Sequence, residues 1–426
     1  TVDCGISSFD EIAAAQKLGV EVVVTDHHNL PERLPPAVAA ADPKRIIGEH
    51  PSKNLSGAGV AFKLAWMLLR LAGQKDNVFL TSLLDLAALG TISDVVPLTA
   101  ENRIIAVRGL KLLNERKRLG VRALAECAGI KKQITVNEIY FGLAPRINAA
   151  GRLEHASKAV ELLLADDETK AGELAKELCQ INVRRQGIGG TIKEEVFARL
   201  NDEMIAASKI VILAGENWHP GVIGIVASQV VDRYNRPTVL ISLEDGAGRG
   251  SARSADGVNI FRLLKSCRDL FLDFGGHERA AGFEIEAAKI PEFESRLRAE
   301  VEKNVSLAEL RPIVEIDAEI EPSKITLSLI KELEMLDPHG EGNPAPLFAS
   351  RNLKVIEARP VGAKKNHLKM KLGDGEISLE VIGFGWGHLQ LNVGYNYDVA
   401  YELQANEWNG FETAQLSLVD IKESAK

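Results

Sequence analysis

The fold of this chain is decided by one stretch, Val22-Val23-Val24-Thr25-Asp26-His27-His28. Four consecutive β-formers follow a helical segment and precede a turn-rich Asn-Leu-Pro, which predicts a buried parallel strand. Three side chains that can bind a metal therefore stand at the carboxyl end of this strand or just beyond it. In open α/β sheets this edge is where ligands bind.

The segments on either side of this strand extend the α/β pattern. Residues 7–18 are predicted to form a helix, because they begin with a Ser/Asp start signal, have apolar residues at helical spacing and are followed by Gly19 as a stop signal. Ser56-Gly57-Ala58-Gly59 opens an apolar helix, and capping and packing are its expected roles because it lacks the Gly-Lys-Ser/Thr ending of a nucleotide-binding loop. Residues 78–89 are expected to form another apolar helix, which leads into the loop that carries Asp94.

The remainder of the chain predicts a connecting helix and a second α/β domain. Residues 157–207 are charge-rich with helical periodicity, whereas Gly187, Gly189 and Gly190 predict a break or kink. In the second domain, strands are expected at 210–213, 237–242 and 249–253, and helices at 221–234 and 258–270.

The last part of the chain predicts a barrel. Alternating runs at 314–320, 367–372 and 397–403 suggest a small antiparallel barrel of the oligonucleotide-binding kind. Its aromatic residues could serve as stacking platforms for bases, but core packing is the expected use. These residues are Phe384, Trp386, Tyr395, Tyr397, Tyr401, Trp408 and Phe411.

The predicted fold class is therefore α/β, with four parts along the chain. A parallel-sheet domain covers residues 1–156 and a long connecting helix 157–207. A second α/β domain covers 208–308, and a C-terminal antiparallel β-barrel of the oligonucleotide-binding fold covers 309–426.

The composition is that of an ordinary globular protein. Of 426 residues 46% are hydrophobic, and 51 Lys and Arg against 59 Asp and Glu give a formal net charge of −8. This balance argues against a generally basic nucleic-acid coat, although a local basic groove is compatible with it. No apolar run is long enough to span a bilayer, so no membrane association is expected. The four cysteines show neither paired spacing nor the density of a disulfide scaffold, which favours the reducing cytoplasm.

The first candidate site is a metal centre. Asp3 is expected at the end of one strand, Asp26-His27-His28 at the end of the next and Asp94 in a loop, so that all could converge on one sheet edge. Carboxylates with imidazoles and no thiolate suit Mn²⁺ or Mg²⁺. A two-metal centre commonly hydrolyses phosphodiesters, because it generates hydroxide near neutral pH and holds the leaving oxygen. The alternative is that Asp26 caps the following turn and the histidines are surface residues.

A second cluster could bind phosphate. Arg146, Asn148 and Arg152 stand among small residues that allow close backbone approach. A guanidinium fork matches the geometry of phosphate. The alternative is a turn whose arginines are only solvated.

A third cluster joins two separate stretches. Ser251, Arg253 and Ser254 follow glycines at a strand end, and Gly275-Gly276-His277 precedes a run of small residues. Together they predict an anion nest at a helix N-terminus. The alternative is close packing of a helix on a sheet, which also requires small residues.

Taken in order, these residues resemble the DHH phosphoesterase superfamily and, within it, the RecJ single-stranded-DNA exonucleases. The resemblance covers essentially the whole chain. A DHH triplet alone is moderately specific, whereas the ordered set of motifs is highly specific. The matching stretches are residues 2–5, 25–28, 57–61, 91–97, 146–152, 218–228, 250–254, 275–277 and 280–282.

The resemblance implies a metal-dependent exonuclease that degrades single-stranded DNA from 5′ to 3′ into mononucleotides, in recombination and repair. It implies a DHH domain, a connecting helix, a DHH-associated domain and an oligonucleotide-binding barrel, with DNA passing between the first two domains. Single-stranded DNA is the expected partner, together with a single-strand-binding protein and a helicase. The expected cofactor is Mn²⁺ or Mg²⁺ in a two-metal site.

The resemblance also implies roles for individual residues. Asp3 would bridge two metal ions, with His27 and Asp94 as further ligands. The catalytic residues would be His28, which contacts metal or phosphate, and Asp26, which orients the imidazoles. The DNA backbone or its 5′ end would be held by Arg146, Asn148, Arg152, Ser251, Arg253, Ser254, Gly275, Gly276 and His277.

The sequence departs from this family at one point. The family's first motif is an Asp-x-Asp pair on the strand before the Asp3 strand, and no such pair precedes Asp3 here. We therefore expect an N-terminal truncation, and weak or no nuclease activity from this polypeptide by itself.

Two alternative functions remain. The first is a DHH phosphodiesterase that acts on short oligoribonucleotides or cyclic dinucleotides, and the additional barrel argues against it. The second is a non-catalytic DNA-binding scaffold on a DHH core. The presence of Asp26, His27, His28 and Asp94 argues against the scaffold, whereas the missing first motif favours it.

Overall fold

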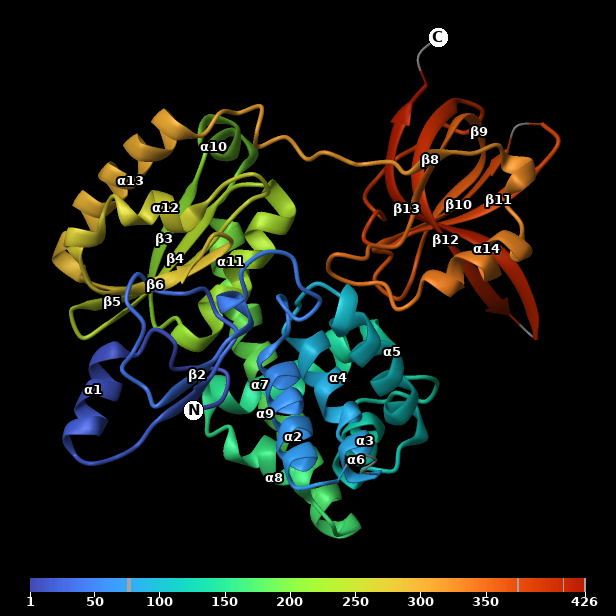
Figure 1. Cartoon of the computed structure of the whole chain (residues 1–426). Helices are drawn as coiled ribbons and strands as arrows, with labels where there is room; N and C mark the ends of the chain where they lie inside the picture. Colours follow the sequence, from blue (N-terminus) through green and yellow to red (C-terminus); the bar gives the residue numbers. More distant parts are fainter. Residues whose placement is uncertain (75–77, 374, 409, 425–426) are drawn as a thin grey trace. The chain divides into compact units, whose positions relative to one another are not determined.

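The computed structural model describes residues 1–74, 78–373, 375–408 and 410–424, with the backbone alone for Asp202 and Trp408 (Figure 1). These residues form two compact units, which are described separately. The first comprises Thr1–Arg45, Thr81–Asp85 and Gly109–Pro312. The second comprises Ile46–Leu80, Leu86–Arg108 and Ile313–Lys426. The predicted fold class is confirmed, because parallel strands, a second α/β sheet and a closed barrel are all present.

The stretch at residues 22–28 forms a parallel strand, as predicted. Strand β1 (Val23–Thr25) pairs in parallel with β2 (Ala39–Ala41), and Val2 forms an isolated parallel bridge with Thr25. Helix α1 (Phe9–Lys17) ends before Gly19, whose φ of +76° lies in the left-handed region that favours glycine. The core of this small sheet consists of Ile6, Ile12 and Val24.

A five-stranded sheet lies at the centre of the second α/β domain. Its strand order is β3-β4-β5-β7-β6, in which β3 and β4 are parallel and the other pairs are antiparallel. The predicted strands are present and slightly longer than expected. The three predicted strands correspond to β3 (Val211–Glu216), β4 (Thr238–Glu244) and β5 (Ala247–Arg253). Two further strands, β6 (Phe271–His277) and β7 (Ala280–Glu286), were not predicted.

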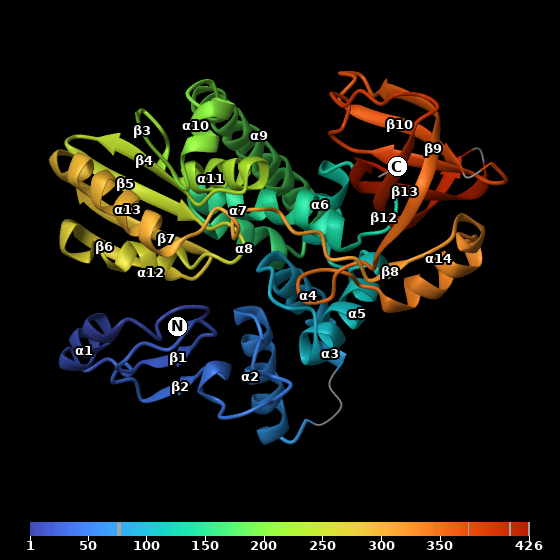
Figure 2. The ribbon, with the colours of Figure 1, turned by 90° about the horizontal axis from the view of Figure 1, so that it is seen from above.

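Helices cover both faces of this sheet (Figure 2). Ile212 and Ile241 point toward α12 (Ile260–Lys265) and α13 (Ile290–Asn304), whose apolar residues belong to the same core cluster. Val211 and Leu240 directly precede these two residues in their strands and point to the opposite face of the sheet. They belong to the core cluster that includes α11 (Pro220–Tyr234) and the connecting helix. This alternation follows from the two-residue period of a strand. Helix α12 ends earlier than predicted, because Arg268–Leu270 form a separate 3₁₀ turn.

The connecting helix α9 (Glu168–Ala198) is continuous over 31 residues, so the predicted break at its glycines is wrong. Asp167 caps its first turn by accepting a hydrogen bond from the Lys170 amide. A Cβ at Gly189 would lie 3.4 Å from Val222 of α11, so this glycine stands where α9 approaches its neighbour. Packing against neighbouring helices stabilises α9 beyond its intrinsic propensity. These neighbours are α6 (Leu119–Cys127), α7 (Ala144–Leu153), α8 (Ser157–Leu164) and α11.

The segment that carries Arg146 and Arg152 is also helical, rather than the turn that was the alternative for the second cluster. A π-helical segment (Glu138–Leu143) runs directly into α7. A short helix, α10 (Asp202–Ala207), follows α9 and is capped by the Asn201 side chain.

A disulfide between Cys127 and Cys179 links α6 to α9, with the two Cα atoms 6.8 Å apart. Sequence spacing did not indicate this pairing, because helix packing alone brings together residues that are 52 positions apart.

The second unit begins with helices. Ser56 caps α2 (Gly57–Leu71) by accepting a hydrogen bond from the Gly59 amide, which confirms the predicted capping role. A Cβ at Gly90 would lie 2.4 Å from the Cβ of Ala58, so these two helices pack closely through small residues. The single helix predicted at 78–89 is wrong, since α3 (Val78–Ser82) and α4 (Leu84–Ser93) are separate; α5 (Ala100–Glu115) follows.

The C-terminal barrel is confirmed, although it is not wholly antiparallel, because β11 and β13 pair in parallel. Its order is β10-β11-β13-β12-β9, and pairing of β10 with β9 closes it. The predicted run at 314–320 forms only the two-residue β8 (Ala318–Glu319), which pairs in parallel with β9. The other elements are α14 (Leu327–Leu333), β9 (Leu347–Val361), β10 (His367–Gly373), β11 (Ser378–Gly383), β12 (Asn396–Trp408) and β13 (Phe411–Glu423).

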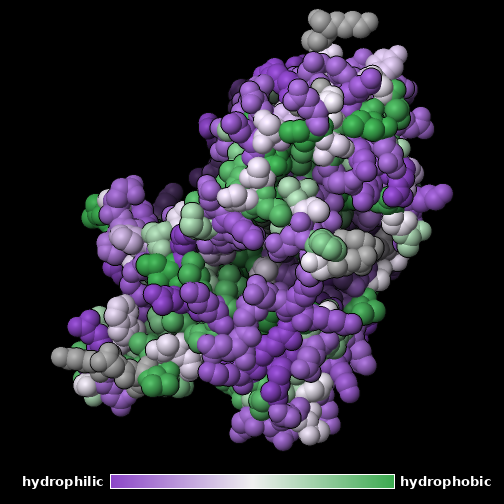
Figure 3. All heavy atoms as spheres, turned by 90° about the vertical axis from the view of Figure 1, so that its right-hand side faces the viewer, coloured by the Kyte–Doolittle hydropathy of each residue, from purple (hydrophilic) through white to green (hydrophobic). Residues whose placement is uncertain are grey.

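The aromatic residues of the barrel divide into two groups. Tyr397 and Tyr401 lie in the core and Trp386 packs against it, as expected. Phe384, Tyr395 and Phe411 are exposed, with 62%, 53% and 76% of their surface accessible, so the expectation of core packing is wrong for them. The side chain of Trp408 lies outside the described residues. Elsewhere the face in Figure 3 is mostly hydrophilic, and hydrophobic side chains form small separate groups.

None of the helices in the described part of the chain combines the length and the apolar character that crossing a bilayer requires.

Candidate metal centre and phosphate-binding residues

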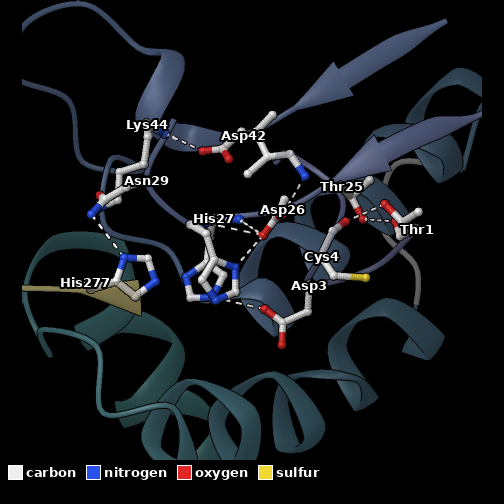
Figure 4. A network of polar contacts seen from close by, with 12 residues as sticks. Thr1, Asp3, Cys4, Thr25, Asp26, His27, Asn29, Asp42, Lys44 and His277 are labelled. Carbon is white, nitrogen blue, oxygen red and sulfur yellow. Dashed lines mark hydrogen bonds and ion pairs between the residues drawn. The ribbon is translucent and has the colours of Figure 1, made fainter. Parts of the chain in front are cut away.

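Three side chains meet at the carboxyl end of β1. Asp3, His27 and His28 each offer one ligand atom, and these atoms lie within 4.8 Å of one another. Nε2 of His27 lies 2.9 Å from Oδ1 of Asp3 (Figure 4). Asp3 reaches this position with a φ of 60°, directly after the bridge between Val2 and Thr25. Strand pairing therefore brings together two groups that are far apart in the sequence.

Asp26 lies beneath this cluster and is only 1% exposed. Its carboxylate accepts hydrogen bonds from the amides of Ile6 (2.9 Å) and His27 (2.7 Å) and from Nδ1 of His28 (2.7 Å). Burial acts to raise the pKa of Asp26, but the hydrogen bonds from His28 and the backbone outweigh it, and the pKa is lower than usual. Asp26 also caps the turn through the His27 and His28 amides. Because an ionised carboxylate only accepts, Nδ1 of His28 carries a proton, and in the neutral form of the ring the lone pair is on Nε2.

The donor set fits a divalent cation. One carboxylate and two imidazoles without a thiolate match the preferences of Mn²⁺ and related ions. Asp26 supplies the carboxylate partner that orients a ligating imidazole. Asp94 follows the C-terminal end of α4 in the second unit and is exposed. Its role as a ligand stays a prediction, as do the roles of Asp3 and His27.

A hairpin of the second α/β domain brings His277 to this centre. The rings of His28 and His277 are stacked, with centroids 5.5 Å apart. Nδ2 of Asn29 donates to Nδ1 of His277 at 3.3 Å. Burial lowers the pKa of His277, and the nearby charges of His28, His27 and Lys44 lower it further. Because the amide nitrogen of Asn29 can only donate, Nδ1 of His277 accepts and the ring carries its proton on Nε2.

The predicted anion nest at a helix N-terminus is wrong for the glycines before His277. Gly275 and Gly276 lie within β6, paired with Gly282 and Ala281 of β7. A Cβ at Gly276 would lie 2.5 Å from the Cα of Ala281, and the φ of Gly276 is +146°. The close approach of β6 and β7 therefore requires this glycine, so the small residue serves packing between two strands rather than the packing of a helix on a sheet.

The structure brings Arg152, Ser251 and Arg253 around the start of α11. Nη1 of Arg253 donates to Oγ of Ser251 at 3.1 Å, and Nη1 of Arg152 donates to the carbonyl of Gly221 at 3.0 Å. A Cβ at Gly224 would lie 2.6 Å from Nη2 of Arg253 and 2.7 Å from Oγ of Ser251. This glycine therefore makes room for both side chains.

The other predicted phosphate-binding residues are engaged differently. Arg146 donates to the carbonyl of Gly142 (2.6 Å) and to Sγ of Cys179 (3.3 Å), inside the helical layer. The hydroxyl of Ser254 donates to the carbonyl of Val258. Asn148 is exposed on α7. Their proposed contacts with phosphate stay predictions.

Sequence reasoning missed Arg185 and Asn182 on α9. Nη2 of Arg185 donates to Oδ1 of the buried Asn182 at 2.7 Å. Burial lowers the pKa of Arg185, and the charge of Arg152 lowers it further. The available signal was an asparagine and an arginine at i, i+3 spacing on one helix face. That pattern does not say which neighbouring element the face meets.

Asp42 was also missed, at the end of β2. It is 7% exposed, and its Oδ1 accepts a hydrogen bond from the Lys44 amide at 2.8 Å. Burial raises the pKa of Asp42, and the negative charge of Asp26 raises it further. The signal was the same as for Asp26, a carboxylate that directly follows a strand.

Comparison with known proteins identifies three family domains in the chain. They are described as the DHH family, N-terminal domain (residues 1–91), the DHHA1 domain (203–303) and the RecJ OB domain (316–420). The single-stranded-DNA-specific exonuclease RecJ of Bacillus subtilis (strain 168) is 39% identical over 429 residues, which cover 100% of this chain and 54% of that protein. Its counterpart in Haemophilus influenzae is 37% identical over 450 residues, with 99% of this chain and 77% of that protein covered.

A solved structure is similar to this chain over its whole length. The crystal structure of RecJ in complex with Mn²⁺ from Thermus thermophilus superimposes with a TM-score of 0.87 at 35% identity, covering 100% of this chain and 62% of that chain. The chain thus spans about half the length of the Bacillus subtilis relative. The three domains, in this order and at these identities, show that the chain belongs to the RecJ family.

Proposed function

We propose that the chain carries the catalytic machinery of a metal-dependent exonuclease, which degrades single-stranded DNA from 5′ to 3′ into mononucleotides in recombination and repair. One observation carries the proposal: Asp3, His27 and His28 form a cluster suited to a divalent cation, and His277 from the DHHA1 domain stacks on it. A phosphodiester bound here would lie near the residues that would hold the cation and near the imidazole N–H of His277.

Each residue of the centre has a separate task in this proposal. Asp3, His27 and His28 would hold Mn²⁺ or Mg²⁺, which supplies a hydroxide near neutral pH and stabilises charge on the leaving oxygen. Asp26 orients His28 through the Nδ1 hydrogen bond. His277 donates from Nε2 to a phosphate oxygen, because Asn29 already occupies its Nδ1. Asp94 is the further ligand that we propose from the sequence.

The preference for a single strand is supported by two features outside the metal centre. Arg152, Ser251 and Arg253 offer two guanidinium groups and a hydroxyl to phosphate. The barrel exposes Phe384, Tyr395 and Phe411, on which unpaired bases can stack. Cyclic dinucleotides and short RNA would not need such a barrel. The relatives named above are single-stranded-DNA-specific exonucleases, which supports the same substrate for this chain.

We further propose that a single-strand-binding protein and a helicase act with this enzyme in the cytoplasm. An exonuclease that needs an unpaired end depends on strand separation, because duplex DNA offers no free bases to the barrel. Addition of a helicase with ATP to blunt duplex DNA is expected to permit degradation. Equal degradation without the helicase would contradict this dependence.

The function is tested with labelled nucleic acids. The chain, in excess over substrate because weak activity is expected, is incubated with single-stranded DNA labelled at either end, duplex DNA or short RNA, in Mn²⁺, Mg²⁺ or chelator. Metal-dependent release of mononucleotides from the free 5′ end of single-stranded DNA supports the proposal. Equal turnover of short RNA would indicate the phosphodiesterase alternative. Metal-independent binding without cleavage would indicate the scaffold alternative.

A further inference from the structure

The segment that carries Asp94 bends sharply between α4 and α5. Val95 has a φ of +57° and Ala100 a φ of +47°, both in the left-handed region that favours glycine. A β-branched residue such as valine is strained in this region, and strained backbone persists only where neighbouring groups hold it in place. The contacts of residues 94–99 with their surroundings therefore decide where the Asp94 carboxylate lies.

A turn near the C-terminal barrel contacts this segment through its main chain. The amide of Leu98 donates to the carbonyl of Glu341 at 2.7 Å. A Cβ at Gly342 would lie 2.9 Å from the Cβ of Pro97. Both segments belong to the second unit of the chain. The Glu341–Gly342 turn therefore limits the positions that the backbone shortly after Asp94 can take.

The turn itself has a defined shape. Gly340 and Asn343 form an isolated antiparallel bridge, in which the amide of each residue donates to the carbonyl of the other at 2.9 and 3.0 Å. Gly342 has a φ of +69°, which favours glycine at this position. Nδ2 of Asn343 donates to the carbonyls of Leu336 (3.1 Å) and Pro338 (3.0 Å). The Asn343 side chain thus fixes the turn to the segment that precedes it.

Two neighbouring side chains of α5 connect the turn and the Asp94 segment. Asn102 is 2% exposed, and its Nδ2 donates to the carbonyl of Pro97 at 3.0 Å. Nη2 of Arg103 donates to the carbonyl of Asp337 at 2.9 Å. One helix therefore binds both segments, and a displacement of the turn would be transmitted to the residues that follow Asp94.

We infer that the Glu341–Gly342 turn is a positioning element for Asp94, so that a turn within the RecJ OB domain helps to set the affinity of the metal centre. The inference rests on the proposed function, in which Asp94 is a further ligand of Mn²⁺ or Mg²⁺. A carboxylate binds a cation tightly only when the surrounding structure holds it in the required orientation. Loss of such a supporting contact commonly weakens metal binding by about 10–100-fold.

The test is a calorimetric titration of the 426-residue chain with Mn²⁺ in the absence of DNA. Gly342→Ala would place a Cβ against Pro97 and an L side chain at a φ of +69°, so the turn and the Asp94 segment must move apart. The Kd for Mn²⁺ is expected to rise about tenfold or more. Asn343→Ala retains Gly342 but removes the hydrogen bonds that fix the turn, and is expected to raise the Kd by about threefold or more.

A double variant shows whether the turn acts through Asp94. Asp94→Asn removes the charge of the proposed ligand and is expected to raise the Kd for Mn²⁺ about tenfold or more. In the Asp94→Asn background, Gly342→Ala is expected to add less than about threefold, because two changes to one interaction are not additive. A full further loss in that background would show that the turn acts independently of Asp94 and would overturn the inference.

Two control variants separate this role from general effects on the barrel. Glu341→Gln changes an exposed side chain but keeps the carbonyl that accepts from Leu98. Gly394→Ala introduces the same kind of backbone strain, at a φ of +90°, where the nearest atom to the new Cβ is 4.0 Å away. Both are expected to bind Mn²⁺ like the wild-type chain. A tenfold loss in Gly394→Ala would show that strain alone weakens the metal centre and would contradict the specific role of the turn.

The outcomes distinguish the inference from the function on which it rests. Circular dichroism shows which variants fold, and Asn343→Ala decides the question if Gly342→Ala does not fold. Folded turn variants with the wild-type affinity for Mn²⁺, together with a loss in Asp94→Asn, would overturn the inference while leaving the nuclease proposal intact. Wild-type affinity in Asp94→Asn would contradict the ligand role of Asp94 in the proposed function, and the inference with it.

Discussion

The imidazole of His277 lies stacked on that of His28, with ring centroids 5.5 Å apart and planes inclined by 15°. Each ring has its own anchor: Asp26 accepts from Nδ1 of His28, and Asn29 donates to Nδ1 of His277. The two Nε2 atoms therefore differ in character, since that of a neutral His28 ring would offer its lone pair to a cation and that of His277 has a proton for a phosphate oxygen.

Asn29 is expected to control the orientation of the His277 proton. Asn29→Ala should lower kcat about tenfold with little change in KM, because the ring loses its partner but the DNA contacts remain. Asn29→Asp should lower kcat further, because a carboxylate would draw the proton to Nδ1 and remove the donor at Nε2. Single-turnover cleavage of 5′-labelled DNA measures the cleavage rate of both Asn29 variants. The control is Glu32→Gln at a nearby exposed position; wild-type rates in both Asn29 variants would contradict the assignment.

His27 is expected to act in metal binding and not in DNA binding. His27→Ala should reduce turnover below detection, since it removes one of the three clustered ligand atoms. DNA affinity in EDTA should stay within about threefold of wild type, because the phosphate contacts lie elsewhere. Mn²⁺ binding by calorimetry provides the second readout, and simultaneous loss of DNA binding by a folded His27→Ala chain would refute this division of roles. Chelator added to the wild-type chain should stop turnover, and excess Mn²⁺ should restore it.

Gly250 is expected to be required by the core of the DHHA1 sheet. A Cβ at Gly250 would lie 2.1 Å from Cζ of Phe283, whose ring is 4% exposed and stacks on Phe271. Gly250→Ala should destabilise the chain by about 1–3 kcal/mol, as overpacking of a dense core does. Gly275→Ala is the control, because a Cβ there would meet nothing within 4 Å. Urea unfolding compares them, and equal midpoints would show that the core adapts without cost.

Glu101 is expected to make stability depend on pH. Its carboxylate accepts hydrogen bonds from Lys63 (2.7 Å) and Ser52 (2.6 Å). Burial acts to raise the pKa of Glu101, but these hydrogen bonds outweigh it and leave the pKa below its ordinary value of 4.5. Since the folded pKa is the lower one, the contribution to stability is present above the unfolded value and is lost as the pH falls through the folded value.

The measurement for Glu101 is the urea midpoint of wild type and Glu101→Gln as a function of pH. At neutral pH the variant should be less stable by about 1 kcal/mol or less, the usual range for a partly exposed pair. The difference should shrink below about pH 4. Glu115→Gln, at the exposed pair with Lys117, should show no comparable pH dependence. A constant difference across this range would contradict the role given to the Glu101 charge.

Much of the fold could be predicted because local patterns agree with the final structure. The β-branched run ending at Thr25 became β1, and the alternating runs that begin at His367 and Tyr397 became β10 and part of β12. The run at 314–320 failed because alternation alone does not provide a partner strand over its whole length. The break predicted in α9 failed because packing outweighs the low helix propensity of three glycines.

The sequence by itself determined the order of the domains, the residues at the end of β1 and their suitability for a divalent cation, because these follow from period, residue type and spacing within short segments. Only the tertiary structure decided that His277 stacks on His28, that Gly276 serves close strand packing, and that Arg152 and Arg253 meet the first turns of α11. These relationships join residues that are distant in the chain. Their geometry depends on how helices and strands pack against one another, which no local pattern encodes.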